Sequence, residues 1–380
     1  MKENKAVGPN LKTYYYFTNN MADQAQVKGV IIIATGMEGT GSLYDEIGDY
    51  LDSKGYAMYA IDEWGYGKTG EVKKKTGYKN WKKKEGHFAA YNIHALSVLA
   101  KSNHKDAPVY LLGNDFGAML SLYLIKEFPE VIDKVVTIGW GAPRLQDYGF
   151  LFNSWIKKIF FYDDGKANWG HRSQNKRFAF RFESGEKYAW LTSDKSQLNK
   201  IKNAGYLDTP GTIGHYFFYY RFKVKYPCWA RLKKCDRSTP MLFISGDHDL
   251  LTIKGRKTRD LVRYYKMKGF TNVESMIFPG RHELLFESNR FQVIDSILSW
   301  LNGGGEVMVK DDKVDVVGNF IKDEVKVVKP IQTEIRKSEA EVGTHPVIDV
   351  EVEEPKASPI MDFQEAEDEL LINTNKENNK

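Results

Sequence analysis

Hydrophobic residues in the first 143 positions fall into short continuous runs separated by helical patterns. Val30–Ala34, Ala57–Asp62 and Lys134–Gly139 are largely apolar runs of strand length, and another, PVYLLG, ends at Gly113. Continuous apolar runs of this length are typical of strands buried on both faces. Between them, SLYDEIGDYLDS, EGHFAAYNIHALSVLAKS and FGAMLSLYLIKEF have the spacing of helices. The alternation predicts a mostly parallel sheet covered by helices on both faces.

The pattern is interrupted at residues 144–236 and then resumes. The interruption is rich in Phe, Tyr, Trp, Lys and Arg and has only weak strand signals. PMLFISG and VESMIF then predict strands, with a helix near 255–268 between them and a last helix in SNRFQVIDSILSWLN. An insertion after a parallel strand lies over the carboxyl ends of the strands, where open α/β sheets bind ligands. We therefore predict a core at 1–143 and 237–302 and a cap at 144–236.

Residues 303–380 differ from the rest of the chain in composition and charge. The segment starts at Gly303-Gly304-Gly305 and has only two aromatic residues, Phe320 and Phe363. It has 10 Lys and Arg against 19 Asp and Glu, a net charge of −9, so residues 1–302 carry 45 minus 31, or +14. Such a segment buries too little apolar surface to offset its conformational entropy. We predict a disordered acidic tail with a short helix at FQEAEDELL, either simply solvated or docked on a partner.

The remaining composition narrows the class of protein. The N-terminus lacks a signal-peptide core, and no apolar run approaches the ~20 residues that span a bilayer. The two cysteines, Cys228 and Cys235, fit a reducing compartment better than a disulfide framework, and they lack the companions of a zinc site. The sequence therefore predicts a cytoplasmic protein with no metal and no cofactor.

Three residues at predicted strand ends have the chemistry of a catalytic triad. Asp115 lies in LLGNDFGAML with a glycine two positions away on each side, which suits a sharp strand-to-helix turn. Asp249 follows a strand in SGDHDLL, where Asp247 competes for the acid role, and His282 follows the last strand in FPGRHELLFE. Nucleophile, acid and histidine occur in this order in α/β-hydrolases. Taken alone, Asp115 is more often a helix N-cap, and the other two suit loop positions.

Backbone N–H groups are the expected oxyanion hole. One belongs to Phe116, directly after Asp115, and the other to Met37 in the glycine-rich loop ATGMEGTGS. The same loop suits a tight turn before a helix that starts at Ser42, and the two interpretations are compatible.

Two long stretches around these residues resemble a known enzyme family. GVIIIATGMEGTGSLYDEIGDYLDSKGYAMYAIDEWGYGKTG and GDHDLLTIKGRKTRDLVRYYKMKGFTNVESMIFPGRHELLFE are similar to the monoacylglycerol lipase and lysophospholipase branch of the α/β-hydrolases. The resemblance covers residues 14–143 and 238–302, and Arg281-His282-Glu283 resembles the core of bacterial lysophospholipase-like members. It implies an α/β-hydrolase fold with a cap, acting on a lipid-like ester.

The chain departs from this family pattern at three places. Thr35 stands at the oxyanion histidine position, Gly65-Tyr66-Gly67-Lys68-Thr69 replaces Gly-His-Gly-x-Ser, and Asp115 replaces the nucleophilic serine. A carboxylate is a weak nucleophile towards a carbonyl group but serves well at saturated carbon, where it forms an ester with the enzyme. His282, held by Asp249, would then activate the water that cleaves this ester.

Three functions remain open from the sequence. The first is hydrolysis of a lipid-like ester, as the resemblance implies. The second is hydrolysis at saturated carbon, because GNDFGA is similar to the Gly-x-Asp-Trp-Gly elbow of epoxide hydrolases and haloalkane dehalogenases. The chain differs from those enzymes in two ways: Phe116 replaces the tryptophan, and the His-Gly-x-Pro loop of epoxide hydrolases is absent. The third is a catalytically inactive protein that binds lipid or a partner. The acid tyrosines of an epoxide hydrolase would come from the cap, which offers Tyr148, Tyr162, Tyr188, Tyr206, Tyr216, Tyr219, Tyr220 and Tyr226.

Two basic segments point to an anionic surface. Lys73–Lys84 contains seven lysines with a Tyr and a Trp, and FKVKYPCWARLKK in the cap is similar. Lysines near anionic lipids contribute about 1 kcal/mol each, and aromatic residues anchor at the membrane interface. A solvated basic loop explains the pattern equally well. We predict peripheral contact with an anionic membrane surface through Lys73–Lys84 and the cap, and no binding of nucleic acid, since no module for it is present.

Overall fold

A computed structural model of the protein describes most of the chain up to Gly303. The described residues are 1–9, 11–36, 39–71, 85–163, 165–167, 178, 182, 186–205, 207, 211–225 and 235–303. Several sequence predictions fall outside them: Met37, Lys73–Lys84, Tyr206, Tyr226, Cys228 and the tail beyond Gly303. Cys235 is buried and free. Among the described helices, none combines the length and the apolar character needed to span a bilayer.

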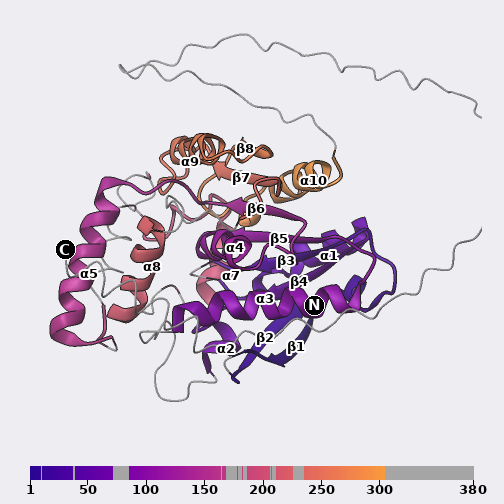
Figure 1. The fold of residues 1–380 in the computed structure, drawn as a ribbon, viewed down its shortest axis with the longest axis horizontal. Helices are drawn as coiled ribbons and strands as arrows, with labels where there is room; N and C mark the ends of the chain where they lie inside the picture. Colours follow the sequence, from indigo (N-terminus) through magenta and orange to yellow (C-terminus); the bar gives the residue numbers. More distant parts are fainter. Residues whose placement is uncertain are drawn as a thin grey trace, which may run out of the picture. The chain divides into compact units, whose positions relative to one another are not determined.

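Eight strands of the described chain form one sheet in the order β1-β2-β4-β3-β5-β6-β7-β8 (Figure 1). They are β1 (Lys2–Val7), β2 (Thr13–Thr18), β3 (Gly29–Ala34), β4 (Tyr56–Ile61), β5 (Val109–Asn114), β6 (Lys134–Ile138), β7 (Met241–Gly246) and β8 (Val273–Phe278). The six strands from β3 to β8 pair in parallel, whereas β1 and β2 add an antiparallel edge next to β4. The predicted mostly parallel sheet is confirmed.

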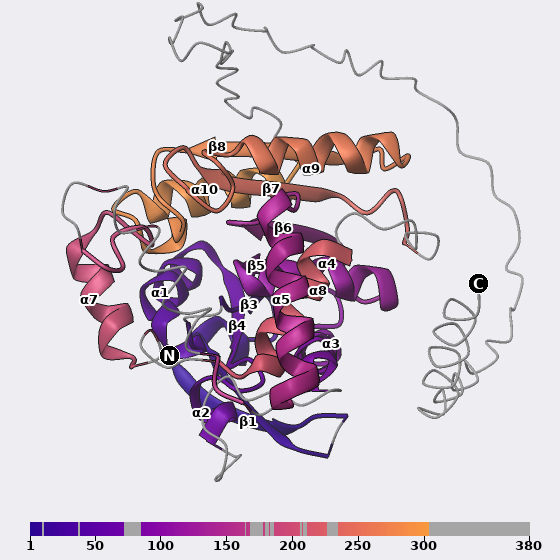
Figure 2. The ribbon, with the colours of Figure 1, turned by 90° about the vertical axis from the view of Figure 1, so that its left-hand side faces the viewer.

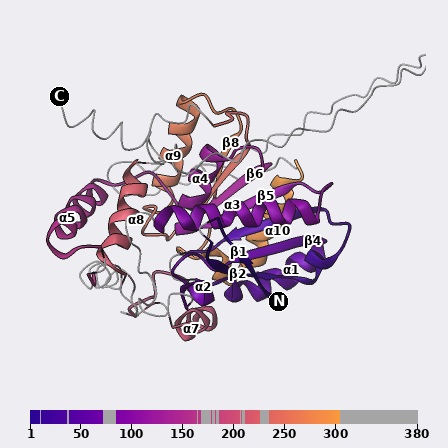
Figure 3. The same cartoon turned by 60° about the horizontal axis from the view of Figure 1, so that its bottom comes forward.

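Helices connect these strands much as the hydrophobic pattern predicts. They are α1 (Asp45–Lys54), α2 (Gly67–Glu71), α3 (Glu85–Asn103), α4 (Phe116–Glu127), α5 (Leu145–Phe161), α7 (Lys195–Asn203), α8 (Ile213–Lys225), α9 (Arg256–Met267) and α10 (Arg290–Leu301). Figure 3 shows α3 lying along the strands. The helix expected from Ser42 begins only at Asp45, because Gly41–Tyr44 forms a 3₁₀ turn.

Alternate residues of the central strands face opposite helical layers. In β3, Val30 and Ile32 belong to the core that includes side chains of α3, α4 and α9, whereas Ile31 and Ile33 belong to the core of α1 and α10. All four are at most 1% exposed. Successive strand residues point to opposite faces, so a sheet covered on both faces needs apolar residues at every position. This requirement explains the unbroken apolar runs in the sequence.

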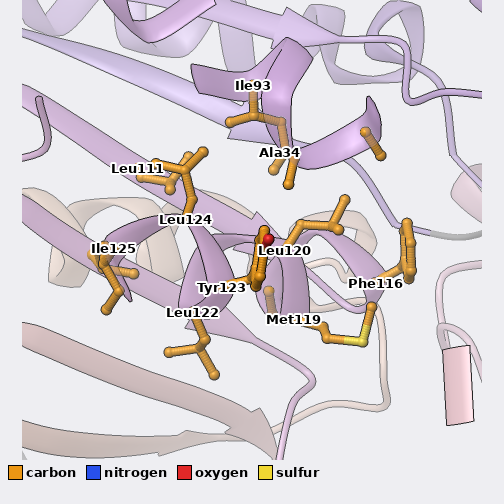
Figure 4. Close-up of a cluster of buried hydrophobic side chains, with 14 of the residues drawn as sticks. Ala34, Ile93, Leu111, Phe116, Met119, Leu120, Leu122, Tyr123, Leu124 and Ile125 are labelled. Carbon is orange, nitrogen blue, oxygen red and sulfur yellow. The ribbon is translucent and has the colours of Figure 1, made fainter. Parts of the chain in front are cut away.

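Helix α4 is buried on every side and fixes the turn that precedes it. Its residues Phe116–Ile125 are all buried. Figure 4 shows Leu120 and Leu124 among the apolar side chains that gather around Ala34 and Leu111 of the sheet. A helix that is apolar all round is stable only inside a core. The end of β5 and the start of α4 are therefore held rigidly against the sheet.

The described part of the cap is largely helical and contacts the core at several places. Helices α5 and α8 lie side by side beyond one end of the sheet, on the side that faces the viewer in Figure 2. Between them, Phe150 stacks on Tyr220 at a centroid distance of 5.0 Å. Helix α7 instead packs near α1, where Gln197 Nε2 donates to Glu46 Oε1 at 2.9 Å.

Candidate active site

Asp115 lies on the sharp turn between β5 and α4. Its backbone has φ +46° and ψ −107°, a conformation that residues other than glycine rarely adopt. The Asp115 N–H donates to the carbonyl of Ile138 at 2.9 Å, and the Asp115 carbonyl accepts from the N–H of Ala118 at 3.1 Å. Strained backbone of this kind persists only where the surrounding structure enforces it, and it clusters at functional sites.

The glycines on either side of Asp115 are required by close packing. A Cβ on Gly113 would lie 2.4 Å from Oγ of Ser121, and a Cβ on Gly117 would lie 2.0 Å from the carbonyl oxygen of Ala34. Both distances are far below van der Waals contact, so a larger residue would push α4 away from the sheet. The Gly-x-Asp-x-Gly spacing thus reflects how closely α4 approaches β3.

The side chain of Asp115 does not cap α4. It occupies the N-cap position, but no capping hydrogen bond runs from its side chain to the first turn of the helix. Its Oδ1 instead lies 3.4 Å from Nε2 of His282, and the side chain is 10% exposed. The N-cap explanation of Asp115 is therefore wrong, because the turn directs the carboxylate towards His282.

His282 lies between two carboxylates. Its Nδ1 is 3.1 Å from Oδ1 of Asp249, whereas its Nε2 contact with Asp115 is longer and not aligned as a hydrogen bond. Contacts of this kind often tighten only when substrate is bound. The ring is buried against that of Trp190 at a centroid distance of 5.4 Å. A Cβ on Gly139 would lie 2.8 Å from Cε1 of His282, so this glycine makes room for the imidazole.

Asp249 is the acid that contacts His282. Its carboxylate is fully buried and accepts hydrogen bonds from a backbone N–H at 2.8 Å and from the hydroxyl of Thr252 at 2.9 Å. Asp247, the competing candidate, is half-exposed and lies 2.6 Å from Nδ1 of His248. The hydrogen bonds to Asp249 fix the orientation of its carboxylate, and the carboxylate in turn holds the His282 ring through Nδ1.

The two carboxylates raise the pKa of His282. Burial by itself lowers the pKa of the imidazole, but the charges of Asp249 and Asp115 outweigh burial and raise the pKa of His282 well above its ordinary value. The two carboxylates thus favour the protonated form of His282. A reaction that neutralises Asp115 would remove one of the two negative charges that raise the pKa of His282.

The loop after β3 covers Asp115. A Cβ on Gly36 would lie 3.4 Å from Cβ of Asp115, which is ordinary van der Waals contact. The next residue, Met37, was expected to supply one oxyanion-hole N–H and lies outside the described residues. Phe116, expected to supply the other, is the first residue of α4. Backbone N–H groups in the first turn of a helix have no acceptor within the helix, as the oxyanion role requires.

Two positions at which the sequence departs from the lipase-like pattern, Thr35 and the Gly65–Thr69 segment, make structural contacts in this chain. The hydroxyl of Thr35 donates to the carbonyl of Ile61 at 3.2 Å and so holds the loop to β4. In Gly65–Thr69, the hydroxyl of Tyr66 lies 2.7 Å from Nε2 of His215 in α8. The segment that carries Gly-His-Gly-x-Ser in the family therefore connects the core to the cap in this chain.

A pocket beside Asp115 adds polar residues that the sequence did not single out. Its empty volume of about 250 Å³ includes space open to solvent, and the pocket itself has room for about one water molecule. Asn114 Nδ2 donates to Glu283 and, at 3.2 Å, to the hydroxyl of Tyr44, whereas Asn114 Oδ1 is buried and has no partner among the described residues. Asn114 and Glu283 directly adjoin Asp115 and His282 in sequence, which is the signal that could have revealed them. The lining residues are Gly36, Gly39, Leu43, Tyr44, Asn114, Leu191, Ile201, Glu283 and Phe286.

Glu283 is a second acidic group of the site. Burial first of all, and then the charge of Asp115, raise the pKa of Glu283 to about 7, although His282 and the amide of Asn114 lower it. The group therefore changes its protonation state near neutral pH. No set of three or more His, Cys, Asp and Glu side chains in the described chain is arranged to hold a metal ion.

Tyr219 in α8 brings an aromatic ring of the cap against Phe116, the residue that follows Asp115. Its ring packs 6.2 Å from the ring of Phe116, between centroids. Burial, followed by the charge of Asp115, raises the pKa of Tyr219 well above its ordinary value, so the phenol keeps its proton. The other described tyrosines that the sequence offered are Tyr148 and Tyr162, which are exposed, and Tyr188, Tyr216 and Tyr220, which are buried.

Lys223 lies one helical turn beyond Tyr219 and is also buried. Its Nζ is 3.8 Å from Oδ2 of Asp147 and lies over the rings of Trp140 and Tyr219, at 5.3 and 5.6 Å from their centroids. Burial lowers the pKa of Lys223, and Asp147 opposes this effect. Asp147 also accepts from the N–H of Arg144 at 2.8 Å. The buried pair therefore joins the start of α5 to α8 next to the site.

Residues 25–289 match the model of a protein family described as serine aminopeptidase, S33. The chain belongs to this family. The family description does not by itself define the reaction of this chain.

Solved structures similar to the S33 chain have the α/β-hydrolase fold. A carboxyl esterase from Bacillus coagulans in complex with glycerol is 18% identical, with 80% of this chain and 98% of that chain covered and a TM-score of 0.70. A soluble variant of monoglyceride lipase from Saccharomyces cerevisiae is 13% identical, with 78% of this chain and 93% of that chain covered and a TM-score of 0.59. The epoxide hydrolase VrEH1 from Vigna radiata is 16% identical, with 80% of this chain and 98% of that chain covered and a TM-score of 0.51. At these identities the likenesses show the fold alone.

Proposed function

We propose that this S33-family hydrolase cleaves an alkyl electrophile at saturated carbon, with Asp115 as the nucleophile. The observation that carries the proposal is the strained turn at Asp115, with φ +46°, which directs a carboxylate towards His282 instead of the helix that it precedes. Backbone strain is costly, about 1–3 kcal/mol, and is found where it supports a mechanism.

In the first step, a carboxylate oxygen of Asp115 attacks a saturated carbon. A carbon–oxygen bond to Asp115 forms, and the bond from that carbon to a halide or epoxide oxygen breaks. A halide leaves without a proton, whereas the alkoxide from an epoxide requires one. The protonated phenol of Tyr219, whose high pKa reflects burial and the charge of Asp115, supports the role of proton donor.

In the second step, water attacks the carbonyl carbon of the Asp115 ester. Because Asp115 is neutral as an ester, it no longer stabilises the imidazolium of His282, and the pKa of His282 falls from its raised resting value. His282 then gives up its proton, to solvent in the halide reaction and to the phenolate of Tyr219 in the epoxide reaction. Neutral His282, oriented by Asp249, takes a proton from the attacking water. The backbone N–H of Phe116 is suited to stabilise the tetrahedral oxyanion, a role that the sequence also predicts for Met37. The carbon–oxygen bond to the alkoxide then breaks, and the alkoxide takes the remaining proton of the former water and leaves as the alcohol. This step restores the Asp115 carboxylate and leaves His282 protonated.

Hydrolysis of a lipid-like ester is the second candidate. It is supported by the S33 match over residues 25–289 and by the apolar part of the pocket lining, which includes Leu43, Leu191 and Phe286. In that case Asp115 would act with His282 as a base for water, because carboxylate attack on an ester would give a mixed anhydride.

A parallel substrate panel separates these candidates. The natural protein, Asp115→Asn and Asp115→Ser are assayed with alkyl halides, epoxides, short-chain acyl esters and a monoacylglycerol. The proposal predicts that the natural protein turns over an alkyl halide or an epoxide, that Asp115→Asn does not, and that only Asp115→Ser cleaves esters. Ester turnover by the natural protein that His282→Ala abolishes would favour the second candidate. No turnover by any of the proteins would support a binding protein without catalysis.

A further inference from the structure

Helix α5 exposes an apolar stripe to solvent. Leu145, Tyr148, Phe152, Trp155 and Ile159 are 49–89% exposed. They follow one another at alternating steps of three and four residues, which places them on one face of the helix. The stripe ends in Phe160, Phe161 and Tyr162, which are 62–75% exposed. These eight residues are more than half of the fourteen large apolar side chains that are exposed in the described chain.

The polarity of α5 is the reverse of that of an ordinary surface helix. Asp147 and Ser154 are its fully buried residues, and Phe150 packs on α8, whereas the aromatic stripe points away. Figures 1 and 3 show α5 at the outer edge of the described structure, with α8 between it and the sheet, and in Figure 2 this side faces the viewer. A surface helix normally turns its charged face to water, so the outer face of α5 is suited to a partner.

The size of the stripe sets it apart from an ordinary surface patch. A large aromatic side chain buries about 150–250 Å² when fully covered. With half or more of each side chain exposed, the eight residues present roughly 800 Å², above the roughly 300–600 Å² of the largest patch on a typical monomer. Patches of this size mark interaction sites for proteins or membranes.

Composition and charge favour a lipid surface over a second copy of the chain. Trp155 and Tyr148 have rings with one polar atom, which suit the headgroup region of a bilayer, and the leucine, isoleucine and phenylalanines suit the acyl region. The net charge of +14 on residues 1–302, which is 45 minus 31, attracts this body to an anionic leaflet. A second copy brings a body of the same charge, which opposes self-association.

We propose that α5 lies flat on an anionic lipid bilayer, with its apolar stripe inserted at the headgroup boundary. The helix has 17 residues, so at about 1.5 Å per residue it spans about 25 Å along the surface. Its buried face packs on α8, whose Tyr219 lies 6.2 Å from the ring of Phe116, the residue after Asp115. The membrane contact therefore lies two helices away from the reacting carboxylate. It does not depend on which bond Asp115 cleaves.

Vesicle flotation tests this surface with the full chain. Phosphatidylcholine vesicles, with and without phosphatidylglycerol, are mixed with the natural protein and with Phe152→Ser/Trp155→Ser/Ile159→Ser. The matched control, Val7→Ser/Val98→Ser/Met267→Ser, changes three exposed apolar residues outside α5. We expect the α5 variant to bind anionic vesicles more than about tenfold more weakly, because each lost insertion removes on the order of 1 kcal/mol. The control should stay within about twofold of the natural protein.

Each other outcome overturns the proposal. Equal binding by the α5 variant and the natural protein would show that another surface makes the contact. Equal binding to neutral and anionic vesicles would remove the charge argument. Absence of vesicle binding, with a dimer by light scattering that the α5 variant loses, would assign the stripe to a second copy. Circular dichroism of the variants, and the single substitutions Phe152→Ser and Trp155→Ser with graded losses, exclude misfolding as the cause.

Discussion

The buried carboxyl of Glu283 gives the site a pH-dependent cost in stability. Its pKa is about 7 in the folded protein, against 4.5 for an ordinary glutamate, chiefly because of burial. Between these two values the unfolded chain binds fewer protons than the folded one. Stability from the protonated carboxyl is therefore fully present below pH 4.5 and is lost as the pH rises through about 7.

The size of this effect follows from the pKa shift. One pKa unit corresponds to 1.36 kcal/mol, so a shift from 4.5 to about 7 amounts to about 3 kcal/mol above neutral pH. Glu283→Gln keeps the shape and an acceptor for Asn114 but cannot ionise. Relative to the natural protein, this variant should therefore be more stable at pH 8 than at pH 5 by up to about 3 kcal/mol.

Thermal unfolding of both proteins at pH 5 and pH 8 measures this difference. At about 2–4 °C per kcal/mol, the melting temperature of Glu283→Gln should rise by roughly 5–10 °C relative to the natural protein between the two pH values. Glu130→Gln, at an exposed carboxyl, is the matched control and should show no such change. If the gap between the natural protein and Glu283→Gln is the same at both pH values, Glu283 does not carry a raised pKa and the reasoning fails.

Two further predictions test the packing that positions the site. Gly117→Ala places a Cβ 2.0 Å from a backbone carbonyl oxygen and should lower the free energy of unfolding by at least about 3 kcal/mol. In the control, Gly149→Ala, the new Cβ meets open space, so stability should stay the same or rise slightly. Urea unfolding measures both changes. Asp147→Asn removes the ion-pair partner of the buried Lys223 and should lower the free energy of unfolding by about 3–5 kcal/mol. Lys223→Met leaves Asp147 its hydrogen bond from the N–H of Arg144, so this variant should lose less stability. Equal losses from the members of either pair would contradict the described packing.

Much of the fold follows from the sequence because its strands are buried on both faces. The runs at β3, β4 and β5 consist almost entirely of apolar residues. The edge strand β1, with the sequence KENKAV, gives no such signal because none of its residues is buried. Its strand conformation comes from pairing with β2, a contact across a turn that local patterning does not reveal.

The triad residues were accessible to sequence reasoning because each follows a strand, and parallel strands end at one edge of the sheet. The N-cap alternative for Asp115 was open in the sequence, since only the backbone angles of the turn decide where the carboxylate points. Tyr219 had no distinguishing signal among the 22 tyrosines of the chain. Its place near Asp115 depends on how the cap helix α8 packs on the core, which is a long-range property.

The most direct test of the central claim is a single turnover in ¹⁸O-labelled water with enzyme in excess over substrate. The substrate is the alkyl halide or epoxide identified in the panel. If Asp115 is the nucleophile, water attacks the Asp115 ester, so mass spectrometry should find ¹⁸O in the peptide that contains Asp115 and not in the alcohol released in that turnover. Label in the product alone, with none in the Asp115 peptide, would mean that water attacks the substrate directly and would contradict the account.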